Sequence, residues 1–190
     1  MNQELALRRT IVEVGRLLYE RKLVVATDGN LSVRLDRKHI LITPSGFCKG
    51  FLSEQDIVRL PLTAGRLPPR AGASTETPMH LATYRTRKDI AAIIHAHPPY
   101  ATRFAVSGRK LNAGLLPETR LFDGPIGRVP YVAPGSARLA QATARALKSH
   151  NFCLLARHGA VAVGRDLLDA YYRLERLEFL AQITLLKADQ

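Results

Sequence analysis

Apolar residues recur along the chain with helical spacing in some segments and strand-like spacing in others. Near the N-terminus their three- and four-residue spacing predicts an amphipathic helix that ends near Arg21, with Leu7, Ile11, Val14, Leu17 and Leu18 on one face. Short apolar runs then predict strands at 23–27, 31–35 and 40–43, separated by turn residues. A loop follows around Pro68 and Pro69.

The second half of the chain continues this alternation. It predicts a helix that begins after Glu76, a strand at 89–97, a helix at 100–106, an irregular or short-stranded segment at 111–134, a helix from its Ser136 cap to about Ser149, a buried strand pair at 152–163 and a long helix at 168–186. The order lacks the regular βαβ period of a doubly wound fold. We therefore predict one α/β domain over residues 1–190 with a mixed sheet.

Composition supports a globular chain with a single core. The 190 residues are 46% hydrophobic and 23% charged, which excludes disorder and fibrous repeats. No apolar run is long enough to span a bilayer. With Cys48 and Cys153 as its two cysteines, the chain cannot build a disulfide framework, so we expect a cytoplasmic location.

The chain is basic, with 28 Lys and Arg against 16 Asp and Glu and a net charge of +12. Such an excess favours nucleic acid, an acidic membrane surface or a phosphorylated small molecule, unless it serves only solubility. The basic residues are scattered and aromatic residues make up only 6%, a poor supply for base stacking. We therefore expect neither a nucleic-acid nor a membrane partner.

Histidines provide the strongest chemical signal. His95 and His97 stand two residues apart on a predicted strand, so both imidazoles can face one point. His158 ends another apolar run and can supply a third nitrogen. Three imidazoles with an open fourth position are typical of a catalytic zinc site, whereas plain hydrogen bonding is the simpler alternative. His80, by contrast, we interpret as an ordinary helix residue rather than as a support for this site.

Glu76 is the candidate carboxylate. Because it precedes a predicted helix, a capping or first-turn role is its simpler interpretation. Ser74 and Thr75 beside it offer donors near a helix start, where anions bind. Polar turns at 28–30 and 43–46 are a second donor cluster, although ordinary turn chemistry accounts for either one alone.

These motifs follow one another in a characteristic order: Gly29-Asn30-Leu31-Ser32-Val33-Arg34, Ile42-Thr43-Pro44-Ser45-Gly46, Ser74-Thr75-Glu76, His95-Ala96-His97 and Arg157-His158-Gly159. The order resembles the class II aldolase/adducin family, in which the L-fuculose-1-phosphate aldolases are the familiar members. The resemblance covers essentially the whole chain. It implies a central, mainly antiparallel sheet flanked by helices, and a cyclic homotetramer with sites between subunits.

The resemblance also implies roles for individual residues. Zinc, or alternatively manganese or cobalt, would be held by His95, His97 and His158, with Glu76 as the proton shuttle. A substrate phosphate would be bound by Asn30, Ser45, Gly46, Ser74 and Thr75. The implied reaction cleaves a ketose 1-phosphate, similar to L-fuculose 1-phosphate, to dihydroxyacetone phosphate and an aldehyde through a metal-stabilised enediolate.

One segment departs from the aldolase pattern. Where fuculose-phosphate aldolases place a tyrosine lent by a neighbouring subunit, this chain has Leu115-Leu116-Pro117. Glu118 is the nearest functional group and is a candidate second acid or base, as in related 4-epimerases. A sugar-phosphate decarboxylase, dehydratase or epimerase is therefore the alternative within the family. An adducin-like binding module without catalysis would have no reason to keep the histidines and Glu76.

Overall fold

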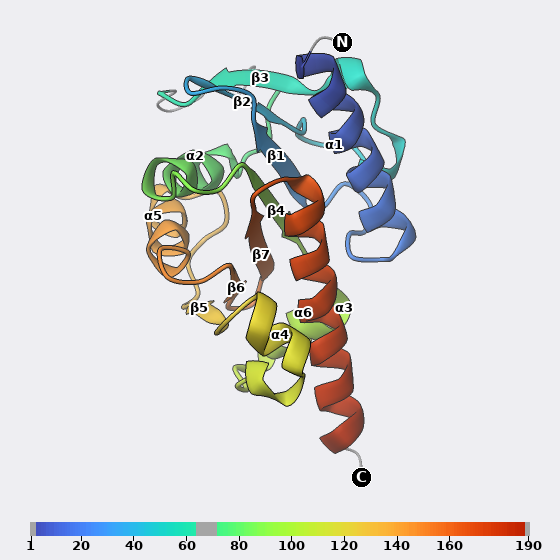
Figure 1. Cartoon of the computed structure of the whole chain (residues 1–190), viewed down its shortest axis with the longest axis vertical. Coiled ribbons are helices and arrows are strands. Elements are labelled where there is room, and N and C mark those ends of the chain that lie inside the picture. The colour runs from blue at the N-terminus through green and yellow to red at the C-terminus, as the bar shows by residue number, and fades with distance from the viewer. Residues whose placement is uncertain (1–2, 64–71, 189–190) are drawn as a thin grey trace.

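The computed structural model describes residues 3–63 and 72–188, and a seven-stranded sheet runs through this part of the chain (Figure 1). Its strands are β1 (Asn30–Arg34), β2 (His39–Ile42), β3 (Val58–Pro61), β4 (Ala92–Ala96), β5 (Gly127–Val129), β6 (Phe152–Leu155) and β7 (Gly159–Gly164). They lie in the order β3-β2-β1-β4-β7-β6-β5, and only the β5–β6 pair is parallel. The prediction of a mixed, mainly antiparallel sheet is confirmed.

Helices cover both faces of this sheet. They are α1 (Gln3–Glu20), α2 (Thr77–Thr86), α3 (Pro99–Ser107), α4 (Pro117–Phe122), α5 (Ala137–Ala146) and α6 (Leu167–Ala188). Helices α1, α3 and α6 pack on one face, and α2 and α5 pack on the other (Figure 1). Ile93 and Ile94 of β4 join opposite cores, because successive strand residues face opposite sides. None of the helices in the described ranges is long and apolar enough to cross a membrane.

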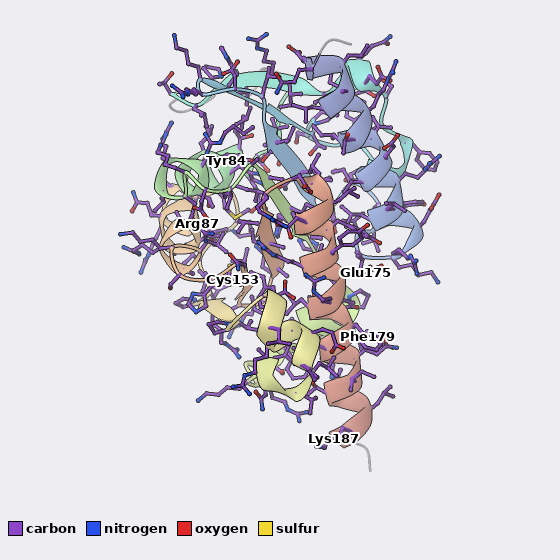
Figure 2. All side chains as sticks on the ribbon, viewed as in Figure 1. Tyr84, Arg87, Cys153, Glu175, Phe179 and Lys187 are labelled. Atoms are coloured by element: carbon purple, nitrogen blue, oxygen red, sulfur yellow. The ribbon has the colours of Figure 1, made fainter. Side chains whose placement is uncertain are left out.

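The local signals of the sequence predicted most of these elements. The first helix, the helix after Glu76 and the strand pair of β6 and β7 form as expected. The Ser136 hydroxyl caps α5 by accepting from the amide of Leu139. Exposed apolar side chains remain on α6, among them Phe179, which projects away from the helix (Figure 2).

The strand predicted at 23–27 is wrong. Lys22 and Ala26 adopt positive φ, and the amide of Leu23 donates back to the carbonyl of Leu18 at the end of α1. The segment therefore turns instead of extending, and it buries Leu23 and Val24 but leaves Val25 exposed.

Other segments refine the prediction. The strand expected at 89–97 spans only Ala92–Ala96, and the segment at 111–134 contains α4 and β5. Strand β3 was not predicted. The loop predicted at Pro68 and Pro69 lies outside the described residues.

Strand β4 positions the chemistry, because it is the central strand of the sheet and lies between β1 and β7. Its register places Asn30 of β1 directly opposite His95. Gly29 precedes this pair at φ 75°, and a Cβ there would lie 2.9 Å from the carbonyl oxygen of His95. Only glycine permits this close approach of the turn to β4.

Candidate metal centre

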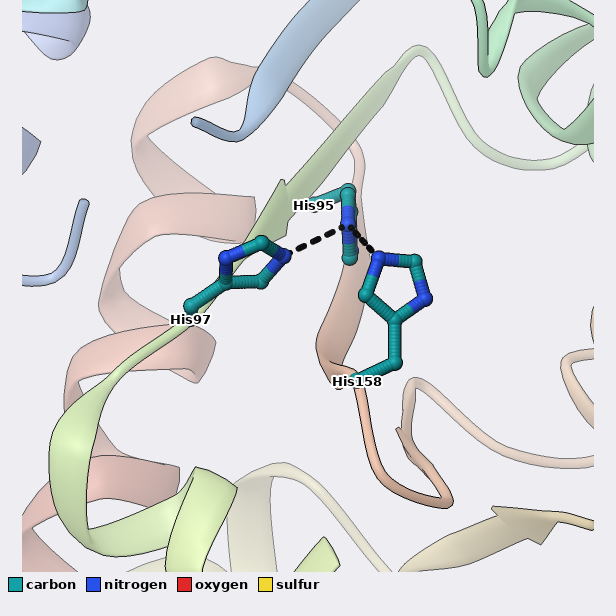
Figure 3. A group of neighbouring side chains, drawn as sticks. All are labelled: His95, His97 and His158. Carbon is teal, nitrogen blue, oxygen red and sulfur yellow. Dashed lines mark hydrogen bonds between the residues drawn. The ribbon is translucent and has the colours of Figure 1, made fainter. Parts of the chain in front are cut away.

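Three histidines from two neighbouring segments meet at one end of β4 (Figure 3). His95 lies on β4, His97 follows its last residue, and His158 lies in the turn between β6 and β7. The Nε2 atom of His95 lies 3.2 Å from Nε2 of His158 and 3.3 Å from Nε2 of His97. The pairing of β4 with β7 thus brings the predicted third histidine to the predicted pair.

The other ring nitrogens show why these Nε2 atoms suit a metal. Nδ1 of His95 donates to the carbonyl oxygen of Ala160 at 2.9 Å, and Nδ1 of His97 donates to the Asp28 carboxylate at 3.3 Å. These bonds leave the Nε2 lone pairs free to bind a cation. Burial lowers the pKa of His97, and it lowers that of His158 to about 4, which favours the neutral ligand form.

Converging lone pairs at such short distances repel one another unless a cation lies between them. The donor set therefore fits a divalent metal, with imidazole nitrogens that suit zinc and also accept other transition metals. The burial of His95 and the contacts with Ala160 and Asp28 orient the rings of His95 and His97, whereas Nδ1 of His158 is buried without a hydrogen-bond partner among the described residues. Plain hydrogen bonding among the histidines is less favourable, because each of these contacts joins two Nε2 atoms. With the ring proton on Nδ1, neither Nε2 atom has an N–H to donate.

Glu76 points at this centre. It holds the N-cap position of α2, yet its side chain makes no capping hydrogen bond. Instead Oε2 lies 2.9 Å from Nε2 of His95, and Oε1 lies 3.9 Å from Nε2 of His158 without a hydrogen-bond partner among the described residues. The capping interpretation of Glu76 is therefore wrong.

The ionisation of Glu76 follows from these neighbours. Burial by itself raises the pKa of this carboxyl group. The hydrogen bond from His95, and the positive charges that the surrounding histidines carry when protonated, outweigh burial and lower the pKa to about 2. A buried, ionised carboxylate beside an open metal position is suited to accepting a proton from a substrate.

A pocket of about 340 Å³ opens beside the histidines. The five residues for which the family resemblance implied phosphate binding all line it: Asn30, Ser45, Gly46, Ser74 and Thr75. A bridge between Pro44 and Ala73 ties the 43–46 turn to the segment before α2, and the amide of Ser74 donates to the carbonyl of Thr43. Polar donors from three distant segments thus surround one cavity.

Glu118 lies elsewhere. It is exposed in the first turn of α4 and is not among the residues that line this pocket. Its role as a second acid or base stays a prediction, one that requires a site shared between subunits.

Lys49 is a pocket residue that sequence reasoning missed. It is buried at the start of a short 3₁₀ helix, Lys49–Phe51, and lines the pocket. Its Nζ donates to the carbonyl oxygens of Thr27 at 2.8 Å and Phe47 at 2.5 Å, and no carboxylate within the described ranges forms an ion pair with it. Burial lowers the pKa of this ammonium, the cost expected of an uncompensated buried cation. The sequence signal that could have indicated Lys49 is its position between Gly46 and Gly50, shortly after the polar turn at 43–46.

The structure also corrects the interpretation of His80. The prediction of an ordinary helix residue is wrong, because the ring is fully buried and bonded at both nitrogens. Nε2 lies 2.6 Å from Oδ1 of Asn30, and Nδ1 lies 2.6 Å from Oγ of Ser32. Burial lowers the pKa of His80 to about 3, so the ring is neutral. Asn30 and Ser32 share a strand face, but only the packing of α2 on β1 brings His80 to them.

Comparison with known proteins gives a consistent result. The family described as Class II Aldolase and Adducin N-terminal domain matches residues 9–185. An L-fuculose phosphate aldolase from Methanocaldococcus jannaschii is 38% identical over 179 residues, covering 94% of this chain and 96% of that protein. A 3-oxo-tetronate 4-phosphate decarboxylase from Haemophilus influenzae is 37% identical over 185 residues, covering 95% and 87%. The crystal structure of an L-fuculose-1-phosphate aldolase from Thermus thermophilus superposes with a TM-score of 0.85 at 33% identity, covering 98% and 96%.

Proposed function

Because the chain belongs to the class II aldolase and adducin family, we propose that it is a zinc-dependent aldolase that cleaves a ketose 1-phosphate to dihydroxyacetone phosphate and an aldehyde. One observation carries the proposal. A three-histidine centre, an ionised carboxylate and a cluster of anion donors share a single pocket. A phosphorylated substrate with a carbonyl group uses all three of these features.

When bound, the metal supplies Lewis acidity that lowers the free energy of a negatively charged substrate oxygen. The residues of the chain manage the protons. The C4 hydroxyl loses its proton, the C3–C4 bond breaks, and the electron pair of that bond stays on the dihydroxyacetone phosphate half. We propose that the Glu76 carboxylate takes the C4 proton and then returns the same proton to C3 of that half, so the step balances. Glu118 of the partner subunit is our candidate for a second acid or base.

Phosphate recognition supports a sugar-phosphate substrate. Lys49 has three N–H donors, of which two bond to the carbonyls of Thr27 and Phe47. The third is left for a ligand in the pocket. The buried ammonium of Lys49, together with the donors of Ser45 and Ser74, favours a phosphate over a neutral hydroxyl group as the ligand.

A screen of ketose 1-phosphates with the metal-loaded protein tests this function, with dihydroxyacetone phosphate and the aldehyde detected by mass. We expect release of dihydroxyacetone phosphate that depends on both the metal and the phosphate. Cleavage that is absent from every ketose phosphate would contradict the proposal.

A decarboxylase is the second candidate, favoured by the 37% identity to the Haemophilus influenzae enzyme. Loss of CO₂ from a 3-oxo acid leaves a similar carbanion next to a carbonyl, so the same pocket could serve. Adding a 3-oxo-tetronate 4-phosphate to the screen separates the two, because only decarboxylation releases CO₂. A dehydratase, a 4-epimerase and a binding module without catalysis are the remaining alternatives. The same product analysis would detect a dehydrated or epimerised sugar phosphate for the first two and no product for the third.

We further propose a homotetramer in the cytoplasm. Four large apolar side chains in the described part of α6 are exposed in the single chain: Leu168, Tyr172, Phe179 and Leu186. A partner subunit would cover them. Sedimentation should give a species of four chains, and a stable monomer at micromolar concentration would refute the assembly.

A further inference from the structure

A row of buried polar side chains lies behind the pocket. It runs from Asn30 through His80 and Ser32 to Tyr84. Asn30 lines the pocket, but His80, Ser32 and Tyr84 do not, and all three are fully buried. These three do not line the pocket, and the hydrogen bonds of the row reach it through Asn30.

Two hydrogen-bond patterns are consistent with this row. In the first, the Tyr84 hydroxyl donates to Ser32, Ser32 donates to Nδ1 of His80, and Nε2–H of His80 donates to Oδ1 of Asn30. In the second, every bond of the row is reversed, so Asn30 donates to His80, and Tyr84 must then donate to the carbonyl of Ala91. Because His80 is neutral, it carries one ring proton and must adopt one pattern or the other.

The distances favour the first pattern. The Tyr84 hydroxyl lies 2.9 Å from Oγ of Ser32 but 3.4 Å from the carbonyl of Ala91. Oδ1 is the Asn30 atom that faces His80, at 2.6 Å. The amide nitrogen of Asn30 therefore remains for the pocket, with two N–H donors.

We propose that His80 is a positioning residue that holds the Asn30 amide with its N–H donors toward the pocket, where an anionic group of the ligand binds. The reversed amide would present its oxygen to that anion and repel it. The inference rests on the proposed function only in so far as the pocket takes a phosphorylated ligand. Ser32 supports the arrangement by donating a hydrogen bond to Nδ1 of His80, and Tyr84 orients Ser32 by donating to its hydroxyl.

The wild-type protein provides the first test, which needs no variant. Nitrogen NMR of the histidine rings should show His80 protonated at Nε2 and unprotonated at Nδ1. A proton on Nδ1 would overturn the proposal, because Asn30 would then present its oxygen to the pocket.

A matched pair of variants provides the second test, with inorganic phosphate as the probe. His80→Gln keeps a donor near the Nε2 position, whereas His80→Asn keeps only the side that faces Ser32. We expect phosphate to shift the Asn30 side-chain NH₂ signal in wild type and in His80→Gln with affinities within about threefold. In His80→Asn we expect binding to weaken about tenfold or more, the effect of losing one charge-assisted hydrogen bond.

Equal phosphate affinity in the two variants would overturn the positioning role and leave His80 purely structural. Absence of phosphate binding to wild type, or an Asn30 signal that phosphate does not move, would also overturn it. Because phosphate binding needs no turnover, failure of the proposed function would appear separately, as a substrate screen without product.

Discussion

The sharpest test of the mechanism is Glu76→Gln. The substitution keeps the shape of a buried side chain that is 6% exposed, and it removes the charge that lies 2.9 Å from Nε2 of His95. Glutamine cannot accept a proton, so turnover should fall by about 10²–10⁴-fold, or roughly 3–5 kcal/mol of transition-state stabilisation.

The same variant should keep the fold and the metal content, although it loses stability from the weakened contact with His95 as well as from the helix. The Glu76 side chain makes no capping bond to α2, so the helix loses only the interaction of a charge with its N-terminal dipole, about 0.3–1 kcal/mol. The metal is expected to stay, because His95, His97 and His158 hold it without the carboxylate.

The assay compares turnover on the ketose phosphate found by the screen with metal content by mass spectrometry and stability by urea denaturation. Glu13→Gln, on the exposed side of α1, is the matched control and should behave as wild type. Near-normal turnover of Glu76→Gln with full metal content would refute the reasoning and promote Glu118 as the acid or base.

Three further outcomes follow from the geometry. Gly159→Ala should weaken metal binding about 10–100-fold in a chelator competition. The added Cβ would lie 2.5 Å from Cδ2 of His97 and 2.5 Å from the carbonyl oxygen of Ala96, so the ring of His97 would have to move. Unchanged metal affinity would contradict this close packing. Lys49→Met keeps the buried stem but removes the ammonium, so the KM for the phosphorylated substrate should rise about 10–100-fold, and an unchanged KM would exclude Lys49 from phosphate binding. Acid should destabilise wild type more than His80→Gln, because the pKa of His80 falls from 6.5 in the unfolded chain to about 3 in the folded one, so only the unfolded chain gains a proton between these values. From pH 6.5 to pH 5 the extra loss should be about 2 kcal/mol by urea denaturation, and a difference between the two proteins that does not change with pH would refute it.

The sequence by itself determined the parts of the molecule that depend on local periodicity. Alternation along β4 and the residue that follows it places His95 and His97 on one face, and the break after Leu155 places His158 in a turn. The Ser136 cap and the apolar face of α6 were likewise readable from short-range spacing. The strand predicted at 23–27 was wrong for a related reason. An apolar run does not reveal a backbone that turns back on α1, and here the turn buries Leu23 and Val24 but exposes Val25.

Only the tertiary structure decided which of these elements meet. The bond from His80 to Asn30 joins residues 50 apart, and the pocket brings Lys49 beside donors from separate segments. Periodicity reports which face of an element is apolar but not which partner covers that face. Glu76 shows the same limit, because its position predicts a helix cap while the packing of α2 against β1 and β4 turns its carboxylate to the histidines. The roles of these side chains depend on long-range packing, which holds a buried polar group only where another element satisfies it.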